Sequence, residues 1–254
     1  MSIYSLYFSP TGGTKKVADL VLKEFDVDTY IDLSDANVDY SIYSFSQDDI
    51  CFISVPSFGG RVPHVVLDRL NKMKADGAYA VLVVSYGNRE FDDTLLELKN
   101  ETEKIGFLAV AAVAAVTEHS IVRKFASGRP DDKDEAELYQ YSRKLKNMFD
   151  TGGFKSVCVP GNETYKKYNG VPLKPDTNKD CNKCGLCAKL CPVNAIEADN
   201  PSETDKDKCI TCMRCIAVCP QNARSINKAA LFLTEERLKK ACSIRKSNKL
   251  FLGN

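Results

Sequence analysis

Short apolar runs alternate with amphipathic segments through the first 150 residues of the chain. The apolar runs predict β-strands over residues 3–9, 27–33, 49–56, 78–87 and 107–116. Between them, apolar residues recur every three or four positions, which predicts helices over residues 14–25, 62–73, 89–106 and 131–149. Residues 34–47 show neither period, so we expect an irregular or short helical crossover there.

This alternation determines the expected fold class. Successive strands separated by helices pair in parallel, and the helices then cover both faces of the sheet. We therefore predict an α/β fold with a five-stranded parallel sheet for residues 1–150.

The pattern changes after residue 150. Residues 151–176 contain scattered Pro and Gly without periodicity, which predicts a linker. We expect a small cysteine-rich α+β domain over residues 177–229 and a C-terminal helix and tail over residues 230–254. The sequence LTEERLKKAC predicts that helix, with Thr234 as its N-cap.

Eight of the 11 cysteines fall in two copies of one pattern. CNKCGLCAKLCP begins at residue 181 and CITCMRCIAVCP at residue 209, so the period is 28 residues. An internal duplication of this kind is typical of a pseudo-twofold mini-domain. A segment this short buries too little apolar surface to fold alone, so it needs cross-links or metal.

The cysteine spacing favours iron–sulfur clusters. Three thiols at three-residue intervals can wrap one corner of an iron–sulfur cube, and in this bacterial spacing the fourth cysteine ligates the other cluster. The first set is then Cys181, Cys184, Cys187 and Cys219, and the second set is Cys209, Cys212, Cys215 and Cys191. Structural zinc takes separated cysteine pairs, and disulfide frameworks belong to exported proteins, so both are weaker alternatives. The segment resembles a bacterial two-cluster ferredoxin, which implies two [4Fe–4S] clusters.

Three glycine-containing loops follow predicted strands: FSPTGGTKK (8–16), VPSFGGRVP (55–63) and VSYGNRE (84–90). In an open parallel sheet, ligands bind beyond the carboxyl ends of the strands. The glycines and hydroxyls of the first loop precede a helix N-terminus, which suits a phosphate. The loop contains neither the Walker sequence nor the G-x-G-x-x-G dinucleotide motif.

The order of these loops resembles flavodoxin over residues 1–150. The resemblance implies the strand order 2-1-3-4-5 and FMN, with its phosphate on the first loop and its ring between the other two. Tyr86 is the first candidate to stack on the ring and Phe58 the second, and Gly13 stands where flavodoxins often carry Asn. The implied FMN-binding residues are Ser9, Pro10, Thr11, Gly12, Gly13, Thr14, Pro56, Ser57, Phe58, Gly59, Gly60, Ser85, Tyr86, Gly87, Asn88 and Arg89.

The charge and hydropathy of the chain indicate which kinds of molecule it is expected to bind. The sequence has 35 Lys and Arg against 34 Asp and Glu, a balance that does not call for nucleic acid. No apolar run reaches the roughly 18 residues of a membrane span, and the N-terminus lacks signal-peptide features, so we expect a cytoplasmic protein without membrane insertion. Ligand thiolates, cluster cores and FMN phosphate would bring the net charge to about −5, which favours redox partners with a basic docking face.

The whole chain resembles the flavodoxin–ferredoxin fusion proteins of anaerobic bacteria and archaea. The resemblance implies an electron carrier that couples FMN to two [4Fe–4S] clusters and shuttles low-potential electrons between redox partner proteins. An FMN-dependent reductase of one small molecule, a non-redox binding module and a homodimer all stay open. No catalytic residue is assigned, although His119 is the one candidate for a general acid; Cys51, Cys158 and Cys242 are given no role.

Overall fold

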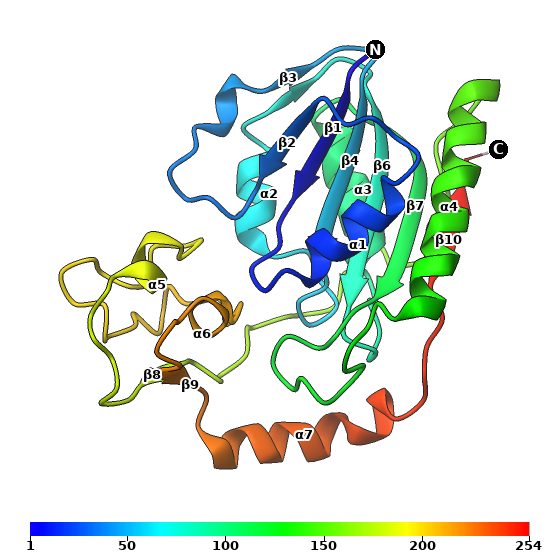
Figure 1. Ribbon diagram of the computed structural model, residues 1–254. Coiled ribbons are helices and arrows are strands. Elements are labelled where there is room, and N and C mark those ends of the chain that lie inside the picture. The colour runs from blue at the N-terminus through cyan, green and yellow to red at the C-terminus, as the bar shows by residue number, and fades with distance from the viewer. Residues whose placement is uncertain (254) are drawn as a thin grey trace.

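The structure is a computed structural model that describes residues 1–253 (Figure 1). Its helices are α1 (Gly13–Val21), α2 (His64–Leu70), α3 (Thr94–Lys104), α4 (Asp132–Thr151), α5 (Leu186–Lys189), α6 (Arg214–Ala217), α7 (Lys228–Cys242) and the 3-10 turn η1 (Tyr40–Ile42). Its strands are β1 (Ile3–Tyr7), β2 (Thr29–Asp32), β3 (Ser44–Phe45), β4 (Ile50–Pro56), β5 (Lys74–Ala75), β6 (Tyr79–Tyr86), β7 (Leu108–Val116), β8 (Asp176–Thr177), β9 (Arg224–Ser225) and β10 (Lys249–Leu252). None of the helices in residues 1–253 has the length and apolarity of a membrane span.

The main sheet has the order β10-β7-β6-β4-β1-β2. Its five parallel strands follow the order 2-1-3-4-5, which is the flavodoxin-like arrangement. The predicted α/β fold and parallel sheet are thereby confirmed. The crossover between β2 and β4 holds only η1 and the short β3, which pairs with β5 outside the main sheet.

The sheet gains a sixth strand that the sequence pattern does not predict. β10 pairs antiparallel with β7, with Leu250 opposite Val113 and Phe251 opposite Ala112. Its side chains alternate across the sheet, since Leu250 packs with the core on one face and Phe251 with the core on the other. β10 therefore covers an edge of β7 that would otherwise expose unpaired backbone groups.

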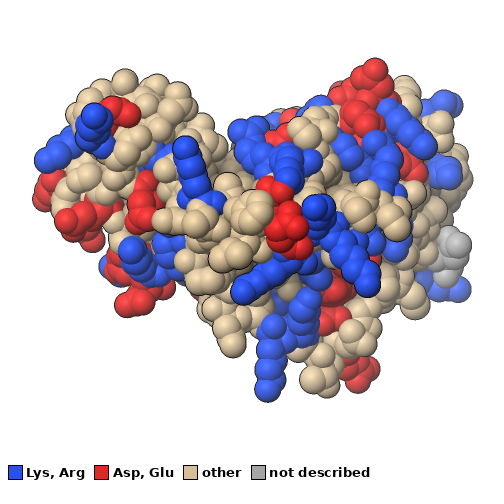
Figure 2. Space-filling model, turned by 90° about the horizontal axis from the view of Figure 1, so that it is seen from below, with Lys and Arg blue, Asp and Glu red and all other residues tan. Residues whose placement is uncertain are grey.

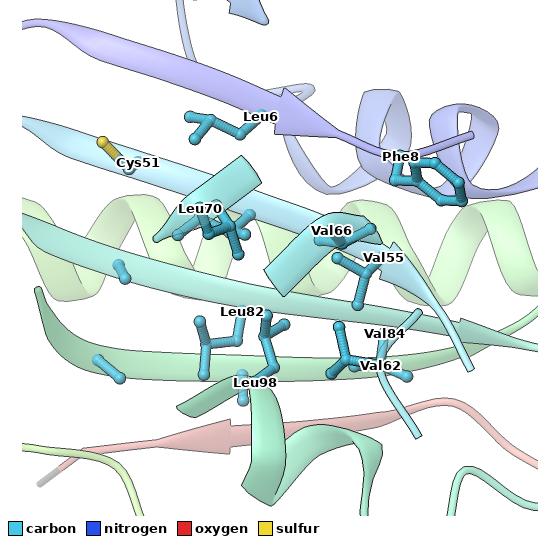
Figure 3. Packing of buried hydrophobic residues seen from close by; sticks show 14 of the residues in the cluster. Leu6, Phe8, Cys51, Val55, Val62, Val66, Leu70, Leu82, Val84 and Leu98 are labelled. Carbon is cyan, nitrogen blue, oxygen red and sulfur yellow. The ribbon is translucent and has the colours of Figure 1, made fainter. Parts of the chain in front are cut away.

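Helices cover both faces of the sheet. α2 and α3 pack on one face, and α1 and α4 pack on the other. Figure 3 shows Val66 and Leu70 of α2 against side chains of the sheet such as Leu6 and Leu82. Cys51 is fully buried in this layer, and burial raises the pKa of its thiol, so it behaves as a small apolar side chain.

The cysteine-rich part repeats in backbone conformation as well as in sequence. Positive φ values recur 28 residues apart, at Lys183 and Thr211, at Gly185 and Met213, and at Asn194 and Asn222. Each copy carries a single short helix, α5 or α6. The antiparallel pair β8–β9 joins the two ends of this part of the chain.

The C-terminal helix begins earlier than predicted. α7 starts at Lys228 and is capped by Asn227, whose Oδ1 accepts hydrogen bonds from the N–H groups of Ala229 and Ala230. Thr234 is therefore not the N-cap; it lies inside the helix and donates to the carbonyl of Ala230. α7, at the bottom of Figure 1, returns the chain from the cysteine-rich part to β10.

Asn88 anchors this returning segment. Its Nδ2 donates to the carbonyls of Cys242 and Ile244 at 2.8 and 3.0 Å, and its Oδ1 accepts from the N–H of Lys246 at 3.0 Å. Asn88 is buried and adopts a positive φ of 62°, a conformation that Asn tolerates better than most residues.

We expect Asn88→Gly to lower the free energy of unfolding by about 1–3 kcal/mol, because three backbone groups of the returning segment, of which the carbonyl of Cys242 is buried, lose their hydrogen bonds. Glycine accepts the positive φ, so the loss reports the side chain rather than backbone strain. Urea denaturation measures the change, and Asn71→Gly at the exposed end of α2 is the control. Equal stability of Asn88→Gly and wild type would contradict the anchoring role.

Candidate redox-cofactor sites

The eight clustered cysteines gather around two separate hollows. All 11 cysteines are free thiols. The first cluster hollow is lined by Cys181, Cys184, Cys187 and Cys219. The second cluster hollow is lined by Cys191, Cys209, Cys212 and Cys215. The structure thus brings together the same two crossed sets that the spacing predicts, so each hollow draws sulfurs from both repeats.

Backbone groups in both repeats point at the sulfurs. The N–H of Ala195 donates to Cys191 Sγ at 3.2 Å, and the N–H of Ala223 donates to Cys219 Sγ at 3.3 Å. These two bonds are equivalent, since each joins the cysteine before proline to the alanine four residues later. Hydrogen bonds to ligand sulfurs are among the factors that set the potential of an iron–sulfur cluster.

Burial makes the thiols of the second cluster hollow hard to ionise without metal. It raises the pKa of Cys212 to about 12 and that of Cys215 to about 11. A coordinated metal deprotonates a thiol outright, so these sulfurs depend on the positive charge of iron to become thiolates. The donor set therefore fits a cluster bound by four sulfurs.

The first loop leads directly into α1. Gly12 adopts a φ of 90° and α1 begins at Gly13. The Ser9 hydroxyl accepts from the N–H of Lys15 at 2.9 Å, and Thr14 Oγ1 lies 2.8 Å from Ser85 Oγ. Because Ser9 occupies the N–H of Lys15, the N–H groups of Gly13 and Thr14 are the first-turn donors of α1 that could meet an anion.

The loop lies at the edge of a second space, the phosphate-side hollow. Thr11, Gly12 and Gly13 line it, together with Thr117, Ser120 and Met213 from more distant elements. A side chain at residue 13 would require Thr117 to shift, because its Cβ would lie 2.6 Å from Thr117 Oγ1. This close approach is a physical reason for Gly13 in place of the Asn that flavodoxins often carry.

The cations around the phosphate-side hollow all have acidic partners. Each pair lies within ion-pair distance, so their charge toward an anion is partly offset. The pairs are Lys16–Glu135 at 3.0 Å, Arg123–Glu118 at 2.6 Å and Arg129–Asp134 at 2.7 Å. Recognition of a phosphate here would rest mainly on backbone N–H groups and the helix dipole.

The second and third loops enclose a neighbouring space, the ring cavity, of about 300 Å³. Ser120 lines both this cavity and the phosphate-side hollow. The predicted residues that line it are Ser57, Phe58, Gly59, Tyr86, Gly87 and Arg89. Other lining residues come from beyond the flavodoxin-like sheet and include Tyr168, Thr211, Thr234, Arg237 and Leu238.

Several predicted residues line neither space within the part of the chain that the structure describes. They are Ser9, Pro10, Thr14, Pro56, Gly60, Ser85 and Asn88. Ser9, Thr14 and Ser85 hold the first loop by the hydrogen bonds above. The side chain of Asn88 is occupied by the returning C-terminal segment, so any contribution to a cofactor would come from its backbone.

The second loop makes a tight two-residue turn. Phe58 and Arg61 exchange backbone hydrogen bonds of 2.9 and 3.2 Å, and Gly59 and Gly60 between them have φ values of 63° and 93°. Positive φ at both central residues is the geometry that favours glycine. A Cβ on Gly59 would lie 2.2 Å from the ring of Tyr168.

Two tyrosines lie at the ring cavity, Tyr86, which is predicted from the sequence, and Tyr168, which is not. The hydroxyl of Tyr86 donates to the carbonyl of Ser247 at 3.3 Å, and its ring packs edge-on against Phe91. Burial raises the pKa of Tyr86 to about 12. Tyr168, from the linker, packs over Gly59 and lines the same cavity. The sequence does not single it out, because it lies in a segment without periodicity that also contains Tyr165.

His119 also lines the ring cavity. Its Nδ1 accepts hydrogen bonds from the N–H groups of Ile121 and Val122 at 3.2 and 3.1 Å. Burial, with a further contribution from Arg89, lowers the pKa of His119 to about 4. The imidazole is therefore neutral at pH 7, and its proton resides on Nε2.

The second cluster hollow adjoins the spaces predicted for the flavin. Thr211 lies between the ligand candidates Cys209 and Cys212 and lines the ring cavity. Its hydroxyl donates to the carbonyl of Val171 in the linker at 3.0 Å. Met213 lines both the second cluster hollow and the phosphate-side hollow. One cysteine loop thus forms part of both sites.

Comparison with known proteins shows which family the cysteine-rich part resembles. Residues 180–223 match the family described as 4Fe-4S dicluster domain. An uncharacterized ferredoxin of Methanocaldococcus jannaschii is 32% identical over 97 residues, which cover 34% of this chain and 60% of that protein. A ferredoxin of Pyrobaculum islandicum is 34% identical over 76 residues, which cover 29% of this chain and 66% of that protein. The chain spans less than two thirds of either relative.

Among solved structures, oxidised flavodoxin 1 from Bacillus cereus aligns at 16% identity and a TM-score of 0.40, over 58% of this chain and 99% of that chain. The strand order assigns the fold independently of this alignment. The chain joins a flavodoxin-like α/β domain to a 4Fe–4S dicluster domain. This is the architecture of a flavodoxin–ferredoxin fusion, as the sequence predicts.

We expect serine variants to reveal the crossed ligand sets. Cys219→Ser should alter the same cluster signal as Cys181→Ser, although Cys219 belongs to the second repeat. Cys191→Ser should instead alter the signal affected by Cys209→Ser. EPR spectra of the reduced, reconstituted proteins measure this. If Cys219→Ser and Cys209→Ser affected one signal together, the crossed assignment would be wrong.

We expect Tyr168→Ala to weaken FMN binding about fivefold to tenfold, because an aromatic contact contributes roughly 1 kcal/mol beyond its buried area. Fluorescence titration of the flavin-free protein with FMN measures the affinity. Tyr165→Ala, three residues earlier and outside the ring cavity, is the matched control. Unchanged affinity for Tyr168→Ala would exclude the contact.

Proposed function

We propose that this protein is an electron carrier that couples one FMN to two [4Fe–4S] clusters and passes low-potential electrons between redox partner proteins. The flavodoxin-like fold and the 4Fe–4S dicluster segment support electron transfer in general. The coupling of the two cofactor types is supported by one observation: Thr211, inside the Cys209–Cys212 spacing, lines the ring cavity. A cluster and a flavin on either side of this residue would be close enough for direct electron transfer.

The geometry of the first loop supports FMN. Thr11, Gly12 and Gly13, at the start of α1, line a hollow that shares Ser120 with the ring cavity. This arrangement suits a molecule with a phosphate at one end and a flat ring at the other. FMN, when bound, exchanges electrons singly or in pairs, whereas iron–sulfur clusters exchange them singly.

The residues that enclose the ring cavity favour the function of an electron carrier over that of a small-molecule reductase. Tyr168, Thr211 and residues of α7 close the space that would be open in an isolated flavodoxin-like domain. Its volume of about 300 Å³ is at the lower end of the range for small-molecule sites. A flavin ring would fill most of it and leave little room for a second substrate.

The reductase remains the second candidate because polar groups line the cavity. His119, Arg89 and Arg237 could contact a small acceptor. The neutral imidazole of His119 would be a hydrogen-bond donor through Nε2 rather than a strong acid at pH 7.

The domain arrangement supports electron exchange with partners at the first cluster hollow. Residues of the cysteine-rich part that line the flavin spaces all belong to the second repeat: Thr211, Met213, Ile216 and Ala217. Cys184 of the first hollow is exposed. Figure 2 shows basic side chains gathered over the face that carries α7 and a mixture of charges on the cysteine-rich lobe at the left. The basic side chains around α7 would disfavour a partner with a basic docking face on that side of the molecule.

We expect anaerobically reconstituted protein to contain one FMN with about eight iron and eight sulfide, and to lack turnover with a panel of small acceptors while reducing a low-potential redox protein. Cofactor analysis and anaerobic stopped-flow assays measure both. Absence of flavin or of labile sulfide would contradict the coupled carrier. Rapid turnover with one small molecule would favour the reductase.

A further inference from the structure

The two repeats differ at the residue before the third cysteine. The first repeat has Leu186 and the second has Arg214 at the equivalent position, 28 residues later. Leu186 lines the first cluster hollow and Arg214 lines the second. At this one position of the repeat, therefore, the second hollow has a positive charge where the first has an apolar side chain.

Arg214 has an unpaired nitrogen in the interior. Its side chain is 16% exposed, and its Nε is buried with no hydrogen-bond partner among the residues that the structure describes. A terminal nitrogen lies 4.0 Å from Asp32 Oδ2, at the outer limit of an ion pair. A buried N–H of a charged group without an acceptor carries a free-energy penalty. The sulfur atoms of a cluster in the adjoining hollow are suitable acceptors.

Two further cations bind the backbone next to ligands of the second cluster hollow. Lys174 Nζ donates to the carbonyl of Cys209. Arg69, which is buried and belongs to α2, donates at 2.5 Å to the carbonyl of Pro192, directly after Cys191. Both cations are thus attached to the ligand loops themselves.

The first cluster hollow is lined by two cations, but neither combines burial with an unpaired N–H group as Arg214 does. Arg224 lines it and is buried, with its guanidinium donating to Thr204 Oγ1 at 2.8 Å and to the carbonyl of Pro201. Lys183, the other cation that lines this hollow, is exposed. Solvent screens an exposed charge far more than a buried one.

Reduction adds one negative charge to a cluster. A buried cation or an N–H donor near the sulfurs stabilises that charge and raises the reduction potential. We propose that Arg214, supported by Arg69 and Lys174, makes the cluster of Cys191, Cys209, Cys212 and Cys215 the higher-potential cluster of the pair. The inference rests on the proposed function and assigns these three side chains a tuning role.

The consequence is a direction for electron flow inside the protein. An electron that enters at the outer cluster would move downhill to the cluster beside the ring cavity. The difference in potential would thereby favour transfer of the electron toward the flavin over its retention on the outer cluster.

The test is a redox titration of the full, reconstituted chain, followed by EPR. Arg214→Leu, which copies the first repeat, should lower the potential of the cluster signal altered by Cys209→Ser. The expected change is about tenfold in the reduction equilibrium, or 59 mV for one electron. The other cluster and the flavin should keep their potentials. Leu186→Arg should raise the potential of the other cluster.

Lys189→Ala is the matched control, because Lys189 is an exposed charge on α5 and its equivalent in the second repeat is Ala217. Lys174 does not line the second cluster hollow. Lys174→Met should lower the reduction potential of the same cluster as Arg214→Leu. Full iron content with unchanged potentials in both Arg214→Leu and Lys174→Met would overturn the tuning role and leave the proposed function standing. Wild-type protein without clusters would instead refute the proposed function.

Discussion

The contact between one cysteine loop and the carboxyl edge of the parallel sheet is the interaction on which the rest of the structure depends. The edge gathers three loops, because the carboxyl ends of parallel strands meet on one side. Thr211 and Met213 bring the second cysteine repeat to that edge. The linker and α7 then enclose the space that remains. A crevice open in an isolated flavodoxin-like sheet becomes a cavity shared by both halves of the chain.

Such a shared cavity requires that the two halves keep a fixed geometry. The chain leaves the sheet after α4 and returns to it as β10, so the cysteine-rich part is tethered at both ends. Arg69 joins the carbonyls of Leu33 and Pro192, one from each half. Asn88 fixes the returning segment beside the third loop. These contacts favour a rigid unit over a mobile cluster domain.

Much of this arrangement can be predicted from local sequence. The alternation of apolar runs predicts the parallel sheet, because burial on both faces leaves long apolar strands such as β7. The cysteine spacing within each repeat predicts which cysteines gather at each hollow, whereas their role as cluster ligands stays a prediction. The three loops are predicted because each follows an apolar strand.

Contacts between distant segments are not predictable in this way. β10 is a four-residue strand at the end of the chain, and only its pairing with β7 gives it structure. Asn88 is a residue type common in loops, and its three backbone partners on the returning segment lie more than 150 residues away. Tyr168 belongs to a segment without periodicity. In each case the structure depends on a contact with a residue far away in the sequence, so the local sequence pattern does not predict it.

The most direct measurement is the rate at which electrons pass between flavin and clusters within one molecule. The flavin of anaerobic holoprotein is reduced by a light flash, and the absorbance of the iron–sulfur clusters is followed over a range of protein concentrations. The account predicts a fast phase whose rate does not depend on concentration, because the second cluster adjoins the ring cavity. A rate proportional to protein concentration would mean transfer between molecules and would contradict the account.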